Sequence, residues 1–252
     1  MAGYTEKELF ETVSVPRAVA TLAIPTIISQ VVTMIYNLAD TFFIGQMGAP
    51  CMVAAVSLVS PWFNLLTALG NLFGLGGSSL ISRMLGEKHG ERVKYVSAFS
   101  IWGGAAVTLC FSLITLGAET QILNFLGASP DTIAYAGSYI FWVVAVGGVP
   151  TMVSLSLGHL LRSEGHARQA SMGMMFGGIL NVILDPILIF GFHMGVTGAA
   201  IATAFSNAMS VVFFAIQYFR LRGRTEASFR PKYFTFRYVG QIFSVGLASA
   251  FA

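Results

Sequence analysis

The stretch YVSAFSIWGGAAVTLCFSLITLGA, residues 95–118, decides the fold, because it is largely apolar and carries no charged side chain. A helix needs about 20 such residues to cross the hydrocarbon core of a bilayer, so this stretch is long enough to span a membrane. Inside lipid the backbone has to satisfy its own hydrogen bonds, which favours a helix over any open structure. We therefore expect a membrane-spanning helix here.

The composition of the whole chain agrees with a membrane protein. Of the 252 residues, 55% are hydrophobic and 10% are charged, and the mean hydropathy is +0.74. An ordinary soluble domain carries about 25% charged residues. The 27 glycines fit helices that pack closely in lipid. Cys51 and Cys110 lie in separate apolar runs without the spacing of a metal or redox motif, so we expect two packed, unpaired thiols.

Five further apolar stretches have a similar character, and a single carboxylate, Asp185, interrupts one of them. They cover Ala18–Ala39, Cys51–Ser82, Thr132–Leu161, Gln169–Gly191 and Met194–Phe219. Most exceed the length that a helix needs to cross the bilayer. The sequence therefore predicts an all-α membrane protein built as a six-transmembrane-helix bundle, followed by the start of a seventh helix.

The predicted organisation has four parts. Residues 1–16 form a cytoplasmic or interfacial segment, in which we expect Glu6–Val13 to be a short helix and which does not resemble a signal peptide. Residues 17–220 form the six-helix lobe, residues 221–237 form a basic linker, and residues 238–252 begin helix 7. The last segment faintly repeats the opening of the first span, which suits a second repeat that starts here.

The positive charges predict the orientation. All 14 Lys and Arg residues fall before the first span, after the last span or in every second connection between spans. The positive-inside rule places these segments and the N-terminus in the cytoplasm of a multi-pass protein of the plasma (inner) membrane. Because the basic residues flank the spans in this way, we expect the net charge of +3 to serve contact with the lipid bilayer and not with nucleic acid. The basic residues are Lys7, Arg17, Arg83, Lys88, Arg92, Lys94, Arg162, Arg168, Arg220, Arg222, Arg224, Arg230, Lys232 and Arg237.

Two acidic residues, Asp40 and Asp185, lie inside predicted spans. A carboxylate at the bilayer centre costs about 2.5–3.5 kcal/mol on insertion scales, so such residues usually serve a function. At the rise of an α-helix, Asp40 lies roughly 34 Å and Asp185 roughly 25 Å from the cytoplasmic start of its own span. Both carboxylates therefore fall in the outer half of the membrane.

Other polar residues lie at a similar depth. Asn181 precedes Asp185 by four residues and shares its helix face. Thr203 lies roughly 14 Å into the last span, and Asn207 is one turn deeper. The oxygens of these side chains could hold a hard cation such as Na⁺, or the two carboxylates could exchange protons as a coupled pair. The sequence predicts no cofactor beyond this coupling ion, H⁺ or Na⁺.

The first span has an unusual density of polar side chains for a membrane helix: Gln30, Tyr36 and Asn37 lead toward Asp40. Pro25 removes the hydrogen bond to the carbonyl of the residue four positions earlier and can kink the helix. We predict that Pro25, Gln30, Tyr36, Asn37 and Asn207 line a substrate cavity or act in its gating.

Four segments together resemble the multidrug and toxic-compound extrusion (MATE) family, whose members export organic cations in exchange for H⁺ or Na⁺. The similarity covers essentially all of residues 10–252. Each segment alone is weak, but the combination is specific. The segments are LAIPTIISQVVTMIYNLADTFFIGQMG (22–48), LRSEGHARQASM (161–172), NVILDPILIFG (181–191) and GVTGAAIATAFSN (195–207).

The resemblance implies twelve helices in two lobes related as a parallel repeat, of which this chain holds the N-terminal half and the start of helix 7. It also implies a cation site in the N-terminal lobe. The family residues of that site match Asp40, Asn181, Asp185 and Thr203. A family proline with a proposed bend matches Pro25, and a family tyrosine near the carboxylate matches Tyr36.

The leading interpretation is therefore a cation-coupled antiporter that exports organic cations or drugs, here as its N-terminal lobe. Its partner would be the missing C-terminal lobe or a second half-size copy. One alternative is a flippase for lipid-linked oligosaccharides, although such anionic cargo calls for a strongly basic cavity. Another is a lobe that transports nothing by itself. An intramembrane aspartyl protease would need motifs that the surroundings of Asp40 and Asp185 lack, so we predict that the protein is not an enzyme.

Overall fold

The computed structural model describes residues 14–221, 223 and 225–250, and within these residues the chain is α-helical without a β-strand. This confirms the all-α fold class. The predicted N-terminal helix Glu6–Val13 lies outside the described residues, as do residues 251–252 at the end of the predicted helix 7.

The helices follow the predicted order, with three additions. The connection after the third span, residues 119–131, contains a short helix, two helices end in π-helical turns, and the linker after the last span contains a 3-10 turn. The elements are α2 (Val15–Gly45), α3 (Pro50–Gly86), α4 (Gly90–Gly117), α5 (Glu119–Phe125), α6 (Ile133–Ile140), η1 (Phe141–Val146), α7 (Gly148–Ser163), α8 (Ala167–Pro186), η2 (Ile187–Gly191), α9 (Gly195–Arg220), η3 (Pro231–Tyr233) and α10 (Val239–Ala250).

Five helical segments in the described part of the chain are long and apolar enough to cross a membrane. They lie in α2, α3, α4, α8 with η2, and α9. A sixth span is formed by α6, η1 and α7 together, which are bent by 50° at a short break. The prediction of six transmembrane helices is met when this bent pair is counted as one span.

The bend between α6 and α7 has local causes. Pro150 has no N–H to donate to the carbonyl of Val146, and the preceding turn widens into the π-helical segment η1. The hydroxyl of Ser112 on α4 donates to the carbonyl of Val144 at 2.8 Å and so satisfies it inside the bundle. A Cβ at Gly148 would lie 2.7 Å from the Oγ atom of Ser112, so the glycine permits this close approach.

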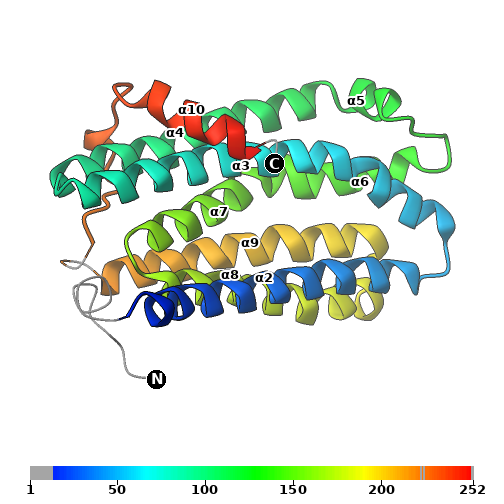
Figure 1. Cartoon of the computed structure of the whole chain (residues 1–252). Helices are drawn as coiled ribbons and strands as arrows, with labels where there is room; N and C mark the ends of the chain where they lie inside the picture. The colour runs from blue at the N-terminus through cyan, green and yellow to red at the C-terminus, as the bar shows by residue number, and fades with distance from the viewer. Residues whose placement is uncertain (1–13, 222, 224, 251–252) are drawn as a thin grey trace.

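The helices form two layers with α7 between them (Figure 1). In one layer α2 packs on α8, and α8 packs on α9. In the other layer α3 packs on α4 and α10. Because α7 contacts α3, α4, α8 and α9, it joins the layers. The buried side chains form two apolar clusters, one around Phe73, Ile81 and Phe214 and one around Leu66, Ile140 and Val144.

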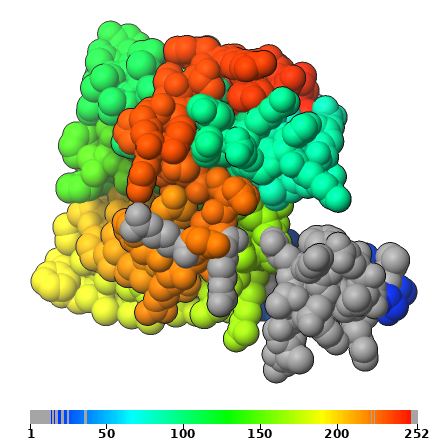
Figure 2. Space-filling view, turned by 90° about the vertical axis from the view of Figure 1, so that its left-hand side faces the viewer, coloured from blue at the N-terminus to red at the C-terminus, as the bar shows by residue number. Residues whose placement is uncertain are grey.

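The linker after α9 folds back onto the bundle and leads into α10. Figure 2 views the end of the bundle where this segment, in orange, lies close to the start of α4. The following α10 then packs on α3 with almost no side chain between the backbones. A Cβ at Gly76 would lie 2.3 Å from the carbonyl oxygen of Ile242, and a Cβ at Gly246 would lie 2.3 Å from that of Leu72. Small residues of this kind let helices approach closely.

Candidate cation site and polar cavity

Asn181 and Asp185, one turn apart on α8, meet Thr203 of the neighbouring helix α9. The side-chain amide of Asn181 lies 3.4 Å from the Oδ1 atom of Asp185 and donates to the hydroxyl oxygen of Thr203 at 3.3 Å. Asp185 is fully buried, and Asn181 is 3% exposed. Three of the four residues predicted for the cation site are therefore in hydrogen-bond contact.

Asp40, the fourth residue, reaches this cluster from α2. It lies close enough to Asp185 for the two carboxylates to interact electrostatically. The Oδ1 atoms of Asp40 and Asn181 and the Oδ2 atom of Asp185 are buried and have no hydrogen-bond partner. A buried acceptor without a partner costs about 1–3 kcal/mol, and more when it is charged.

These three unsatisfied oxygens define which ligand suits the cluster. Hard cations prefer oxygen ligands, and a proton on either carboxylate would supply the missing donor. Among the residues that the structure describes, no group of three or more His, Cys, Asp or Glu side chains is placed to hold a metal ion. The cluster thus offers two carboxylates and a neutral amide oxygen to a proton or to a hard cation.

The end of α8 holds Asp185 next to a break in the helix. Pro186 follows Asp185 directly, and the chain continues as the π-helical turn η2. In this turn Phe192 donates its N–H to the carbonyl of Ile187 at 2.9 Å, and Met194 donates to that of Leu188 at 3.1 Å. The helix type therefore changes directly after Pro186, and π-helical turns are often found at functional sites.

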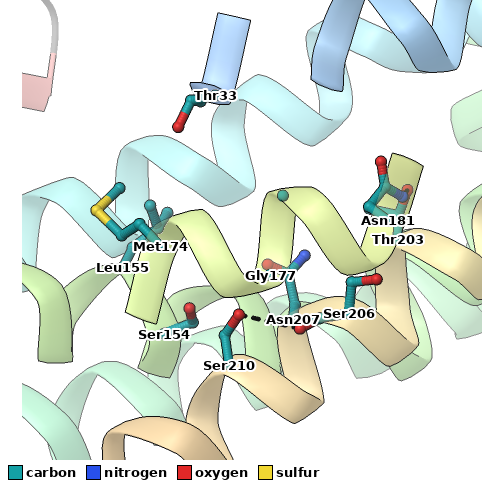
Figure 3. Close-up of a pocket in the computed structure, with 11 residues that line it drawn as sticks. Thr33, Ser154, Leu155, Met174, Gly177, Asn181, Thr203, Ser206, Asn207 and Ser210 are labelled. Atoms are coloured by element: carbon teal, nitrogen blue, oxygen red, sulfur yellow. Dashed lines mark hydrogen bonds between the residues drawn. The ribbon is translucent and has the colours of Figure 1, made fainter. Parts of the chain in front are cut away.

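A polar cavity adjoins the cluster and shares Asn181 and Thr203 with it (Figure 3). Its empty volume, including the open side, is about 480 Å³. Helices α2, α7, α8 and α9 all contribute to its wall, which consists largely of hydroxyl, amide and glycine positions. The lining residues are Thr33, Ser154, Leu155, Met174, Gly177, Gly178, Asn181, Thr203, Ser206, Asn207 and Ser210.

The residues predicted for the cavity divide into three groups. Asn207 lines it and donates its side-chain amide to the hydroxyl of Thr151 at 3.0 Å. Gln30 is exposed on α2, one turn before Thr33, and does not line the cavity. Pro25, Tyr36 and Asn37 lie within α2, but their side chains fall outside the described residues.

Most of the cavity wall was not anticipated from the sequence. One part of it could have been predicted, because the spacing of the polar residues on α9 puts them on one side of the helix. They are Thr203, Ser206, Asn207 and Ser210. The contribution of Ser154 and Thr33 depends on which faces of α7 and α2 turn inward, and one helix at a time does not reveal that.

Arg162 contacts α2 and one residue of the cavity wall. The charge pattern predicts that Arg162 lies in a connection between spans, but it lies in the last turn of α7 and is half-buried. Its guanidinium donates to the hydroxyl of Ser29 on α2 at 3.1 Å and lies 3.0 Å from the sulfur of Met174, which lines the cavity. The Nε atom is buried without a partner. Arg162 thus connects α7 to α2 and α8.

Comparisons with known proteins agree on one family. The MatE family model matches residues 25–187. The multidrug export protein MepA of Staphylococcus saprophyticus is 38% identical over 211 residues, which cover 84% of this chain and 47% of that protein. MepA of Staphylococcus haemolyticus is 37% identical over 241 residues, 94% of this chain and 52% of that protein. The chain spans about half the length of these relatives.

Solved structures show the same likeness. A MATE transporter in the straight conformation matches with a TM-score of 0.89 and 28% identity, over 99% of this chain and 55% of that one. A MATE transporter in the bent conformation matches with a TM-score of 0.83 and 29% identity, over 98% of this chain and 55% of that one. From the family match, the relatives and the shared fold, we conclude that this chain belongs to the MATE family.

Proposed function

We propose that this chain is the N-terminal lobe of a multidrug antiporter that exports organic cations in exchange for H⁺ or Na⁺. The observation that carries the proposal is the group of buried acceptor oxygens on Asp40, Asn181 and Asp185 that no donor satisfies. A bound proton or Na⁺ would supply the missing partner. When it leaves, the buried oxygens again lack a partner, which costs free energy. A site of this kind suits an ion that binds and leaves in every cycle.

The coupling between ion and substrate would run through α2. This helix carries Asp40 to the cation cluster and Thr33 to the cavity wall, and it packs on α8. Without a positive charge between them, Asp40 and Asp185 repel each other. Binding of H⁺ or Na⁺ removes that repulsion and lets α2 settle against α8, which would reshape the cavity. Pro25 lacks the N–H of a continuous helix and is the natural hinge for this movement.

The cavity lining has no charged side chain and offers hydroxyl, amide and thioether groups. The carboxylates of the adjoining cluster would favour a cationic substrate. A lipid-linked oligosaccharide carries an anionic pyrophosphate, which calls for positive side chains, so the flippase alternative finds no support in these residues. Two of the relatives carry the printed name "multidrug export protein". We extend that activity to this chain, and we expect no enzymatic activity from it.

The rest of the assembly is part of the same proposal. The apolar spans are those of a multi-pass membrane protein. We assign it to the plasma membrane, with the N-terminus and the helix ends that carry the basic residues in the cytoplasm. On α2 the large side chains Val31, Met34, Ile35 and Leu38 are exposed. A missing C-terminal lobe or a second half-size copy would give this helix a partner.

The test is efflux from vesicles that contain the 252-residue chain and a fluorescent organic cation, with H⁺ or Na⁺ gradients imposed separately. We expect gradient-driven export, and the effective gradient identifies the coupling ion. Asp40→Asn should abolish the export, whereas Asp131→Asn, an exposed residue in the connection before α6, should leave it intact. Undiminished export by Asp40→Asn would refute the proposed coupling. A folded chain that exports nothing would be a lobe that needs its partner.

A further inference from the structure

A basic and aromatic segment connects α9 to α10, and its backbone is fixed to α4. The N–H of Ser228 donates to the hydroxyl of Ser97 at 2.9 Å, and the indole of Trp102 donates to the carbonyl of Phe229 at 2.9 Å. The segment is therefore bound to the helix bundle. It presents its side chains at the end of α4 that Figure 2 faces.

Two lysines from different parts of the chain both lie near the ring of Tyr233 there. The Nζ atom of Lys232 lies 4.8 Å from the ring centroid of Tyr233, and the Nζ atom of Lys94 lies 5.2 Å from the same centroid. Lys94 is also 5.5 Å from the ring of Tyr95, which meets Tyr233 edge to face. Cation–π contacts fix both ammonium groups in place but leave their hydrogen-bond donors available.

Among the described residues, the pair has no anionic partner. In the part of the chain that the structure describes, no carboxylate forms an ion pair or hydrogen bond with Lys94 or Lys232. Two like charges held near one ring repel each other, so an anion bound near both would relieve that repulsion. Among the described residues of the linker, Glu226 is the acidic one, and it approaches Gly90 instead.

The surroundings of the pair place it at the depth of lipid headgroups. Tyr95 begins the apolar stretch of α4, and Trp102 lies two turns further along the same helix. Tyr and Trp at such positions mark the boundary between hydrocarbon and headgroups. Phe236 of the linker is 72% exposed and also contacts the ring of Phe99, as a side chain would that enters the lipid boundary.

We propose that Lys94 and Lys232, braced on Tyr95 and Tyr233, bind the phosphate of an anionic phospholipid headgroup in the leaflet at this end of the bundle. This inference is independent of the transport function proposed above. Lysines near a membrane surface strengthen the binding of anionic lipid by about five-fold each, so removing both should weaken it roughly 30-fold.

The experiment measures lipid binding to the purified full chain in detergent by native mass spectrometry. Phosphatidylglycerol is the probe, phosphatidylcholine is the zwitterionic comparison, and inorganic phosphate is the free anion. We expect a preference for phosphatidylglycerol that Lys94→Gln with Lys232→Gln reduces roughly 30-fold. The matched control, Arg83→Gln with Arg168→Gln, removes the same charge from two exposed residues of the same end and should retain most of the binding.

Three results would overturn the assignment. Equal losses in the two double variants would mean diffuse attraction to a basic surface. Equal binding of the two lipids would remove the role of the anionic headgroup. Displacement of phosphatidylglycerol by inorganic phosphate alone would make this a site for a free anion. The single change Lys232→Gln, at an exposed residue, provides a variant that should fold normally and lose about five-fold.

Discussion

Asn181 and Thr203 join α8 to α9 through a hydrogen bond of 3.3 Å that uses the same amide nitrogen as the contact with Asp185. The Oδ1 atom of the same amide is buried and has no hydrogen-bond partner. The hydrogen bonds thus orient the amide so that its oxygen can serve as a ligand.

This organisation predicts that a coupling cation stabilises the lobe directly. If the ion is Na⁺, a concentration of 100 times its Kd should add about 2.7 kcal/mol to the free energy of unfolding. Asp185→Asn should lose this gain, because it removes a charged ligand from the buried cluster. The measurement is the Tm of the purified chain in sodium chloride against choline chloride, with Asp131→Asn as the exposed control. A full sodium effect in Asp185→Asn would contradict the assignment of the site.

The close approach of α8 and α9 predicts a second, purely structural effect. A Cβ at Gly173 would lie 2.3 Å from the ring of Phe214, which is fully buried, so the ring or the helices would have to shift within the packed core. Overpacking of this kind costs about 1–3 kcal/mol, so Gly173→Ala should lower the free energy of unfolding by that amount. Gly117→Ala is the control, because nothing lies within 4 Å of its new Cβ. Equal stability of the two variants would show that the helices can separate at little cost.

The sequence predicted well whatever depends on one helix at a time. Apolar length defined the spans, the interval of four residues put Asn181 and Asp185 on one face, and the helical rise brought Thr203 near their depth. What it missed depends on helices packing together. Ser154 and Thr33 line the cavity only because α7 and α2 are rotated inward, and Arg162 was assigned to a connection although it bonds to Ser29 across the bundle.

Glu164, in the connection between α7 and α8, predicts a dependence of stability on pH. Its Oε1 atom accepts the N–H of Ala227 at 2.7 Å, and the hydroxyl of Thr225 donates to Oε2. Burial raises the pKa of this carboxyl above its ordinary value of 4.5, although the hydrogen bonds from Thr225 and Ala227 act against the rise. A raised pKa in the folded state means that ionisation disfavours folding.

The stability that Glu164 contributes is therefore complete below pH 4.5 and is lost as the pH rises through its raised pKa. Glu164→Gln imitates the protonated form, and its amide can still accept from Ala227. We expect the two proteins to have similar Tm values in acid, and the natural chain to fall below the variant as the pH rises. Parallel profiles over the whole range would show that Glu164 does not set this dependence.

The contact between Arg162 and Ser29 predicts how firmly the first half of α2 is held. Ser29 lies one turn after Pro25 and one turn before Thr33, so the contact joins the proposed hinge to the cavity wall. A hydrogen bond to a charged group contributes about 1.5–3 kcal/mol. Ser29→Ala should therefore make local opening of α2 more frequent by about ten-fold or more, which amide hydrogen exchange at residues 30–33 would measure.

The matched control is Ser60→Ala, because the hydroxyl of Ser60 donates only to Val56 within its own helix, α3. That change should leave exchange in α2 as it is. Arg162→Met should reproduce the effect of Ser29→Ala, and the double variant should add little, because both changes remove one shared hydrogen bond. If instead the two single effects add, Arg162 holds α2 through something other than Ser29, and its contact with Met174 becomes the link between α7 and the cavity.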